Sequence, residues 1–119
     1  SHVLEHIINC KKIISNLKNL LSKDGVLFIE VPNCGNEKSL NDSVTTQPHL
    51  HHFTKKSLQF LLEGSGFKII STDIFSAHVR SIPEHIKYLL KWIFKIDHYL
   101  HTTENEGNLL RIIATKNQN

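Results

Sequence analysis

Three side chains suited to metal binding or proton transfer lie close together at the start of the chain, which begins Ser-His-Val-Leu-Glu-His. His2, Glu5 and His6 are spaced i, i+3 and i+4, so on a helical turn they would share one face. A carboxylate beside two imidazoles can bind a divalent metal ion. An imidazole such as that of His6 can instead remove a proton from a substrate hydroxyl, because its pKa lies near neutrality. Both chemistries are open for this segment.

A second group of histidines, His49, His51 and His52, follows the first predicted strand. Residues 33–52 contain three Asn, one Gly and one Pro, and we expect one long loop there, which in a compact domain is usually functional. If this loop closes over the first group, His51 would join His2, Glu5 and His6 as a metal ligand, or His51 or His52 would act as a general base. A structural alternative is that the segment at 52–54 docks the loop and caps the next helix.

The elements that must position these side chains follow from apolar periodicity and turn residues. We expect helices at residues 7–22, 55–63 and 83–99, and strands at residues 26–31, 67–74 and 108–115. Thr54 is a suitable N-cap for the second helix, and the continuous apolar run at 26–31 is typical of a strand buried on both faces. The chain itself begins like the end of a buried strand. This alternation predicts a three-layer α/β fold over residues 1–119.

The sheet predicts where the polar side chains gather. In open α/β sheets, ligands bind beyond the carboxyl ends of the parallel strands, which places residues 1–6 together with Pro32 and Asn33 at the mouth of a crevice. Val3 and Leu4 are expected in the core. Glu5 has a second interpretation as an acid favoured by the dipole at a helix start.

Composition narrows the function classes. The net charge of +3 is small and the basic residues are spread along the chain, so nucleic acid is not an expected partner. Cys10 and Cys34 form no metal-binding pattern and are too few for a disulfide framework. No apolar run is long enough to span a membrane. We therefore expect a cytoplasmic location, and the Asn- and Lys-rich, Met-free composition favours a bacterial source.

Four segments in this order resemble the C-terminal half of a class I S-adenosylmethionine-dependent methyltransferase. They are SHVLEH at 1–6, LLSKDGVLFIEVPN at 20–33, HLHHFT at 49–54 and GF at 66–67. The resemblance covers residues 1–74 well and 108–115 by position. It implies a partial Rossmann-like fold that retains strands five, six and seven, with the last strand antiparallel between the other two. Residues 75–107 match nothing in particular and would form an inserted helical segment.

The resemblance also implies S-adenosylmethionine as cofactor and methyl transfer to an acceptor. The residues implied are Ser1, His2 and Leu4 for the cofactor, Glu5, Pro32, Asn33 and His49 for the acceptor, and His6, His51 and His52 for catalysis. The family's glycine-rich turn and ribose-binding acid have no counterpart here, so the chain alone is expected to bind cofactor poorly and to be inactive. Some similar methyltransferases bind a metal through Glu-x-x-Glu-His and a later His, and here His2 replaces the first Glu.

The expected partners are a small-molecule methyl acceptor and a missing N-terminal half. Strand 26–31 would have an open edge without that half, and such edges invite pairing with another chain, so self-association through it is expected. An alternative function is a truncated, non-catalytic remnant that acts as an interaction module. The predicted helix at 83–99 carries a lysine stripe opposite apolar and aromatic residues, which suits packing on the sheet, a lid over the acceptor or contact with a membrane surface.

Overall fold

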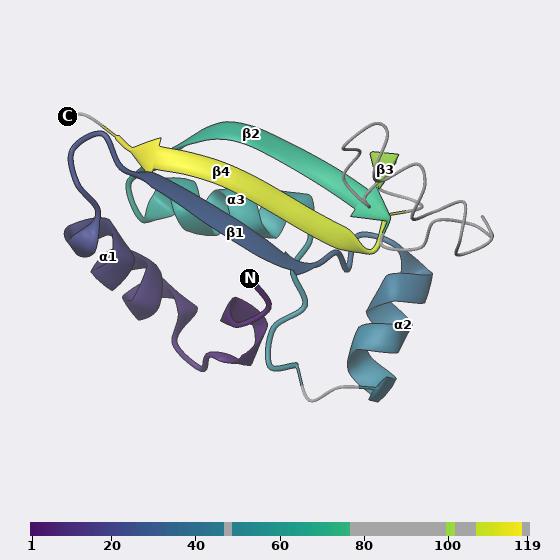
Figure 1. The fold of residues 1–119 in the computed structure, drawn as a ribbon. Helices are drawn as coiled ribbons and strands as arrows, with labels where there is room; N and C mark the ends of the chain where they lie inside the picture. Colours follow the sequence, from purple (N-terminus) through teal and green to yellow (C-terminus); the bar gives the residue numbers. More distant parts are fainter. Residues whose placement is uncertain (47–48, 77–99, 102–106, 118–119) are drawn as a thin grey trace, which may run out of the picture.

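A computed structural model of the chain describes residues 1–46, 49–76, 100–101 and 107–117 (Figure 1). Its elements, in chain order, are η1 (Leu4–His6, a 3-10 helix), α1 (Cys10–Leu20), β1 (Val26–Pro32), α2 (Glu37–Thr46), α3 (Lys55–Gly64), β2 (Phe67–Ser76), β3 (Leu100–His101) and β4 (Leu109–Lys116). The alternation of helices and strands confirms the predicted α/β class.

The four strands form one sheet in the order β1-β4-β2-β3, and every neighbouring pair is antiparallel (Figure 1). β4 lies between β1 and β2, so those two strands run parallel to each other. This is the predicted placement of the last strand. The pairing of β1 with β4 sets Ile29 opposite Ile112, and a bulge between Ile69 and Ser71 interrupts the pairing of β2 with β4.

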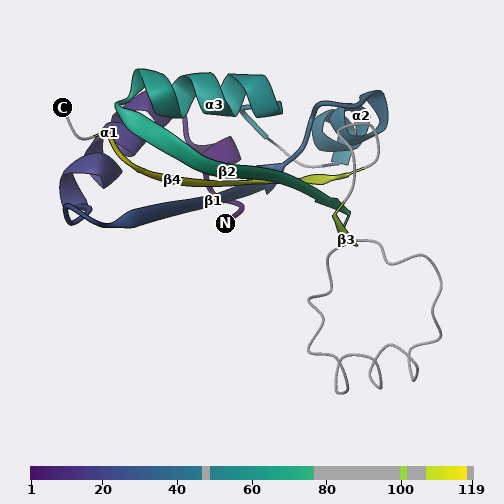
Figure 2. The same ribbon diagram turned by 90° about the horizontal axis from the view of Figure 1, so that it is seen from above.

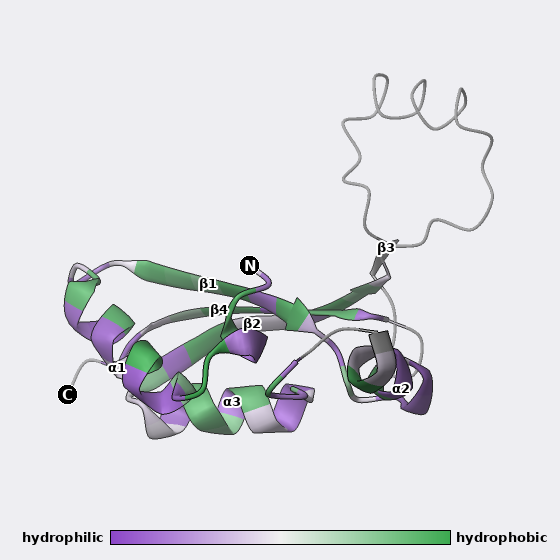
Figure 3. Cartoon of the chain, turned by 90° about the horizontal axis from the view of Figure 1, so that it is seen from below, coloured by the Kyte–Doolittle hydropathy of each residue, from purple (hydrophilic) through white to green (hydrophobic). Residues whose placement is uncertain are grey.

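The described residues form two layers, because α1 and α3 cover one face of the sheet and α2 lies beyond its end (Figure 2). Most of β1 and β4 is hydrophobic (Figure 3), but from Val26 to Ile29 only alternate side chains of β1 are buried. Leu27 and Ile29 pack toward the helices, whereas Val26 and Phe28 point to the other face and are 57% and 49% exposed. The predicted three layers, and the prediction that this strand is buried on both faces, are therefore wrong for the described residues.

Side-chain caps decide where two of the helices begin. The side chain of Asn9 accepts a hydrogen bond from the Lys12 amide at 3.0 Å, so α1 begins at Cys10 rather than at residue 7. Thr54 caps α3 as predicted, and Ser57 completes a reciprocal capping box that satisfies two backbone donors. At the end of α3, Gly66 has φ of 82°, a conformation that glycine adopts without a steric cost.

The predicted loop at 33–52 is wrong over half its length, because it contains α2. The Asn36 side chain accepts a hydrogen bond from the Ser39 amide at 2.8 Å, which provides the helix with an N-cap. Leu40 and Val44 lie one turn apart, but both are exposed. The helix therefore lacks the buried apolar stripe on which recognition from sequence depends.

The start of the chain also differs from expectation. Leu4 is buried as predicted, but Val3 is 57% exposed, and residues 1–3 are not assigned to a strand. One backbone hydrogen bond, from the His2 amide to the Glu30 carbonyl at 2.9 Å, joins this segment to the outer edge of β1. The predicted buried strand end is thus reduced to a single backbone contact.

The predicted insertion is described only at its ends. β2 continues to Ser76, and its last two residues pair with β3. The predicted helix at 83–99, with its lid and membrane interpretations, lies outside the described residues. Among the residues that are described, no helix has the length and apolar character needed to cross a membrane.

Candidate functional site

The structure brings the two histidine-bearing segments together at η1. The backbone carbonyl of Glu5 accepts hydrogen bonds from the amides of Leu50 and His51, at 2.9 and 3.1 Å. These bonds fix residues 49–53 against residues 4–6, segments more than forty positions apart. The predicted approach of the two groups is confirmed.

The centre of the site is the carboxylate of Glu5. The residue is 1% exposed, and neither carboxylate oxygen has a hydrogen-bond partner among the described residues. His2 Nδ1 lies 3.5 Å from Glu5 Oε1, and His6 Nε2 lies 4.0 Å from the same oxygen. Because a buried charge is costly unless it is paired and hydrogen-bonded, this carboxylate is an unsatisfied group in the midst of polar side chains.

Glu5, His6 and His49 lie close together, and all three have side chains of the kinds that bind metal ions. One potential ligand atom from each lies within 4.8 Å of the other two, and the rings of His6 and His49 are 4.9 Å apart between centroids. Metal binding by the predicted set of His2, Glu5, His6 and His51 stays a prediction, and among the described residues the structure groups Glu5 and His6 with His49 rather than with His51. His49, predicted only as an acceptor contact, takes the place of His51, and His2 lies at the margin beside Glu5.

His51 is held by contacts of its own. Its Nε2 lies 2.9 Å from the backbone carbonyl of Ile7, and its ring stacks on Phe53 at a centroid distance of 5.8 Å. Since a carbonyl accepts only, Nε2 carries the proton of this bond. The structural alternative named residues 52–54 for docking the loop; the structure gives this role to Phe53 and also to His51, and a catalytic role for His51 stays a prediction.

His49 and His52 share a hydroxyl group. Ser43 Oγ lies 2.6 Å from His49 Nδ1 and 3.1 Å from His52 Nδ1. Burial lowers the pKa of His49 and outweighs the opposing influence of Glu5, so the neutral imidazole is favoured. Sequence reasoning missed Ser43 because it lies on α2, which was predicted as loop; a helix there would have placed it two turns from the cap at Asn36.

His2 links this cluster to the sheet. Its Nε2 lies 3.3 Å from Glu30 Oε1, while Nδ1 faces Glu5, and its backbone φ of 51° is uncommon for a residue other than glycine. Ser1 donates a hydrogen bond to the same Glu30 oxygen at 3.0 Å, and Arg111 donates to the other. Burial raises the pKa of Glu30, but the hydrogen bonds from Arg111 and Ser1 outweigh it and hold the pKa below its ordinary value.

Asn33 has a structural role at the end of β1. It is fully buried, its Nδ2 donates to the Gly107 carbonyl at 2.8 Å, and its Oδ1 accepts from the Gly35 amide at 3.1 Å. These bonds fasten the end of β1 to the residues that precede β4. Pro32, half-buried, lies beside it as the last residue of β1. Acceptor contacts by Pro32 and Asn33 stay predictions.

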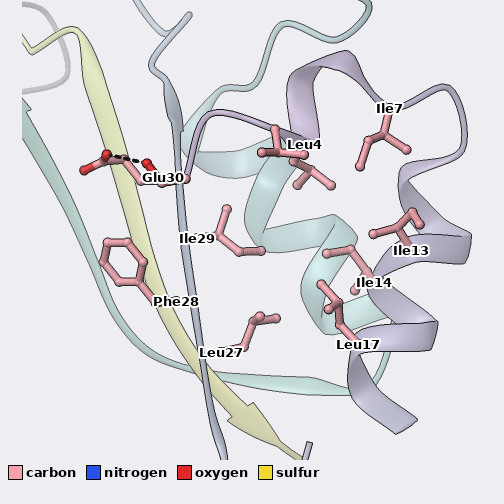
Figure 4. A pocket seen from close by; sticks show the side chains of 11 residues that line it. Leu4, Ile7, Ile13, Ile14, Leu17, Leu27, Phe28, Ile29 and Glu30 are labelled. Atoms are coloured by element: carbon pink, nitrogen blue, oxygen red, sulfur yellow. Dashed lines mark hydrogen bonds between the residues drawn. The ribbon is translucent and has the colours of Figure 1, made fainter. Parts of the chain in front are cut away.

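A small apolar hollow of about 120 Å³ lies between β1 and α1 (Figure 4). Leu4, Ile7, Ile14, Leu17, Leu27 and Ile29 line it, and Ser1 and Glu30 lie at its edge. Ligand pockets for cofactor-sized molecules measure about 300–1,000 Å³, and Leu4 belongs to the hydrophobic core. This hollow is therefore too small for a cofactor of the size of S-adenosylmethionine, and the roles predicted for Ser1, His2 and Leu4 stay predictions.

Comparisons with known proteins agree with this architecture. Residues 1–72 match the family model described as a methyltransferase domain. The fold is similar to the crystal structure of a SAM-dependent methyltransferase from Archaeoglobus fulgidus, with a TM-score of 0.67 and 22% sequence identity, over 98% of this chain and 57% of that one. A search of curated proteins finds no match. The family model covers more than half of the chain, which therefore belongs to the methyltransferase-domain family.

Proposed function

We propose that this chain forms the acceptor side of an S-adenosylmethionine-dependent methyltransferase that acts on a hydroxyl group of a small molecule. The observation that supports this most strongly is the Glu5 carboxylate, which is buried, has no hydrogen-bond partner in the part of the chain that the structure describes, and is flanked by His2, His6 and His49. A buried polar group is costly when it is left unpaired. The arrangement favours a ligand whose polar hydrogen or positive charge completes the site.

Methyl transfer to a hydroxyl group requires two functions of this chain. S-adenosylmethionine, when bound, supplies an electrophilic methyl group, so the protein has to orient the acceptor oxygen and remove its proton. Glu5 is suited to orientation, because a carboxylate accepts a hydrogen bond from a hydroxyl. A neutral imidazole from His6, His49 or His52 is suited to proton removal.

The proposal includes the position of this chain in a larger domain. The chain spans about half the length of the archaeal structure to which it is similar. We assign β1, β2 and β4 to strands five, six and seven of a seven-stranded sheet, and residues 1–119 to its C-terminal half. The support is the position of β4, antiparallel between β1 and β2. The cofactor-binding residues would then belong to the other half.

Calorimetric titration with S-adenosylmethionine tests this division of the site. We expect no saturable heat from residues 1–119 alone, because the hollow beside the predicted cofactor residues Ser1 and Leu4 is too small and too apolar for this ligand. The same titration of a protein that joins a methyltransferase N-terminal half to this chain should give one-to-one binding. Saturable binding to residues 1–119 alone would contradict the proposed division.

A second candidate function for the same cluster is the binding of a divalent metal ion by Glu5, His6 and His49. It is favoured by the short mutual distances of their ligand atoms and by the neutral imidazole that burial favours at His49, since metals bind the deprotonated nitrogen. A metal here would orient the acceptor hydroxyl and lower the pKa of that hydroxyl.

Metal content after dialysis against Zn²⁺ or Mn²⁺ tests this candidate. We expect about one equivalent in the wild-type chain and a loss of at least tenfold in affinity for His49→Ala, because removal of a mere hydrogen-bond partner of a ligand already costs about 10–100-fold. His51→Ala is the matched control, since His51 bonds the Ile7 carbonyl instead, and it should retain the metal. Equal metal content in wild type and His49→Ala would exclude this site.

The remaining assignments are proposals that rest on the sequence. They comprise a small-molecule acceptor rather than nucleic acid, a cytoplasmic location and a bacterial source. The alternative of a non-catalytic interaction module shares the fold but not the site chemistry. It predicts that neither the joined protein nor residues 1–119 transfers a methyl group, while self-association persists.

A further inference from the structure

Ser43 lies between two histidines in a way that constrains where their protons are. The serine is buried at 5% exposure on α2, and its single hydroxyl contacts Nδ1 of both His49 and His52. A serine hydroxyl has one proton to donate and two lone pairs that accept. It can therefore donate to only one of the two rings.

The hydroxyl proton has to go to an imidazole rather than elsewhere. The other neighbour of Ser43 is Cys34, and burial raises the pKa of its thiol, although the hydrogen bond from Ser43 acts in the opposite direction. The sulfur is thus a protonated thiol, which is a weak acceptor. An imidazole nitrogen is the better acceptor, so one ring accepts from Ser43 and the other ring donates to it.

The two distances identify which ring accepts. Hydrogen bonds donated by a hydroxyl are typically shorter than those donated by an N–H group. The contact of 2.6 Å to His49 fits a bond donated by Ser43, and the contact of 3.1 Å to His52 fits a bond donated by the ring. His49 then carries its proton on Nε2, and His52 carries its proton on Nδ1 and has a lone pair on Nε2.

We propose that Ser43 is a positioning residue that holds His49 and His52 in opposite tautomers, so that His52 is the ring of this pair that presents a basic Nε2 to the acceptor. As a statement about the base, this rests on the proposed function. His52 is exposed on the surface, where an acceptor can reach it. The proton moves from the acceptor oxygen to His52 Nε2, and the imidazolium that forms keeps its Nδ1–H bond to Ser43.

The contact with Ser43 also constrains His49. His49 contributes one ring nitrogen to the cluster with Glu5, and its Nδ1 is already occupied by Ser43. With Nδ1 occupied by Ser43 and the proton on Nε2, His49 has no free lone pair, so this tautomer excludes both proton removal and metal binding by His49. The Ser43 hydroxyl thus leaves His52 as the ring of this pair that can remove a proton.

Long-range ¹⁵N NMR of the chain with ¹⁵N-labelled histidine tests the assignment without any methyl transfer. At a pH where both rings are neutral, His52 should show a protonated Nδ1 and His49 a protonated Nε2, with the signals assigned from His49→Gln and His52→Gln. In Ser43→Ala, His52 should lose its Nδ1–H form, while His49 keeps its Nε2–H form. Ser43→Thr retains the hydroxyl and should restore the wild-type pattern.

Two results would overturn the proposal. One is the same tautomer for both rings in the wild-type chain, which is decisive even if Ser43→Ala does not fold. The other is a His52 tautomer that is unchanged in a folded Ser43→Ala variant, since a merely structural serine would give that result. Opposite tautomers together with failure of the joined protein to bind S-adenosylmethionine would instead remove the proposed function and leave the role of Ser43 in place.

Discussion

Glu5 serves the fold with its backbone and the site with its side chain. Its carbonyl anchors the segment that carries His49, His51 and His52, and its carboxylate lies unsatisfied at the centre of the cluster. A side-chain substitution therefore leaves the anchoring bonds intact. The effect of the Glu5 carboxylate on the free energy of unfolding can therefore be measured while the backbone hydrogen bonds of Glu5 stay in place.

At the residue scale, Glu5→Gln should stabilise the free chain. The change removes a buried charge that has no hydrogen bond among the described residues, and such an unsatisfied group costs about 1–3 kcal/mol, more when it is charged. Urea denaturation at neutral pH measures the effect. Glu63→Gln, an exposed position on α3, should stay within about 0.5 kcal/mol of wild type. A Glu5→Gln variant that unfolds at lower urea would mean that the carboxylate has a stabilising partner.

For Glu30→Gln we expect the opposite change in the free energy of unfolding, because the Glu30 carboxylate is well paired. Its pKa is held below the ordinary value of 4.5 by Arg111 and Ser1, so the folded state favours the ionised form. The stability from this pairing is fully present above pH 4.5 and is lost as the pH falls through the lower, folded-state pKa. Glu30→Gln should cost about 1–3 kcal/mol at pH 7.

The pH dependence of the free energy of unfolding tests the role of Glu30. The difference in unfolding free energy between wild type and Glu30→Gln should shrink as the pH falls below 4.5, because a protonated Glu30 resembles glutamine. Denaturation curves at neutral and acid pH measure it, with Glu63→Gln as the exposed control. A difference that stays constant down to pH 3 would show that the pairing with Arg111 has no part in stability.

At the scale of elements, the sequence predicts what the hydrophobic pattern controls and misses what side-chain caps control. Strands at 26–31, 67–74 and 108–115 agree with β1, β2 and β4 within two residues at each end, because their apolar runs are long and bounded by turn residues. α2 was missed because Asn36 and not an apolar stripe specifies it. The exact partners within the site were missed for the same reason, since Ser43 became visible only once α2 was known.

The site was predicted in its composition but not in its pairing. His2, Glu5 and His6 do converge, as their spacing indicated, and the loop histidines do approach them. Which histidine reaches Glu5 depends on the direction of each ring along an irregular segment. His49 and His51 are two residues apart and point to different partners, and no periodicity read from the sequence distinguishes them.

At the scale of the whole molecule, the sheet has β1 at one edge, with exposed apolar side chains. An edge of this kind is a template for pairing with another chain, so we expect self-association at high protein concentration. Val26→Lys should shift the chain toward monomer, because a charge on an edge strand opposes pairing. Sedimentation velocity over a concentration series measures the effect.

Ile70→Lys is the matched control for the edge. Ile70 is as exposed as Val26, at 57%, but lies at the bulge of β2 on the far side of β4. It should leave association unchanged. A wild-type chain that is monomeric at every concentration, or equal effects of the two lysines, would contradict pairing through β1.

The hydrogen bonds of Asn33 have a consequence for how this protein can diversify. They fasten the end of β1 to Gly107, while the register of β2 against β4 extends to Phe75 and Leu109. The two ends of the segment between β2 and β4 are thus held by contacts that do not depend on the segment itself. Because closing a longer loop between fixed ends costs only about 0.6 kcal/mol for each doubling in length, segments of very different length can be exchanged there. Such an exchange would leave the histidine cluster in place.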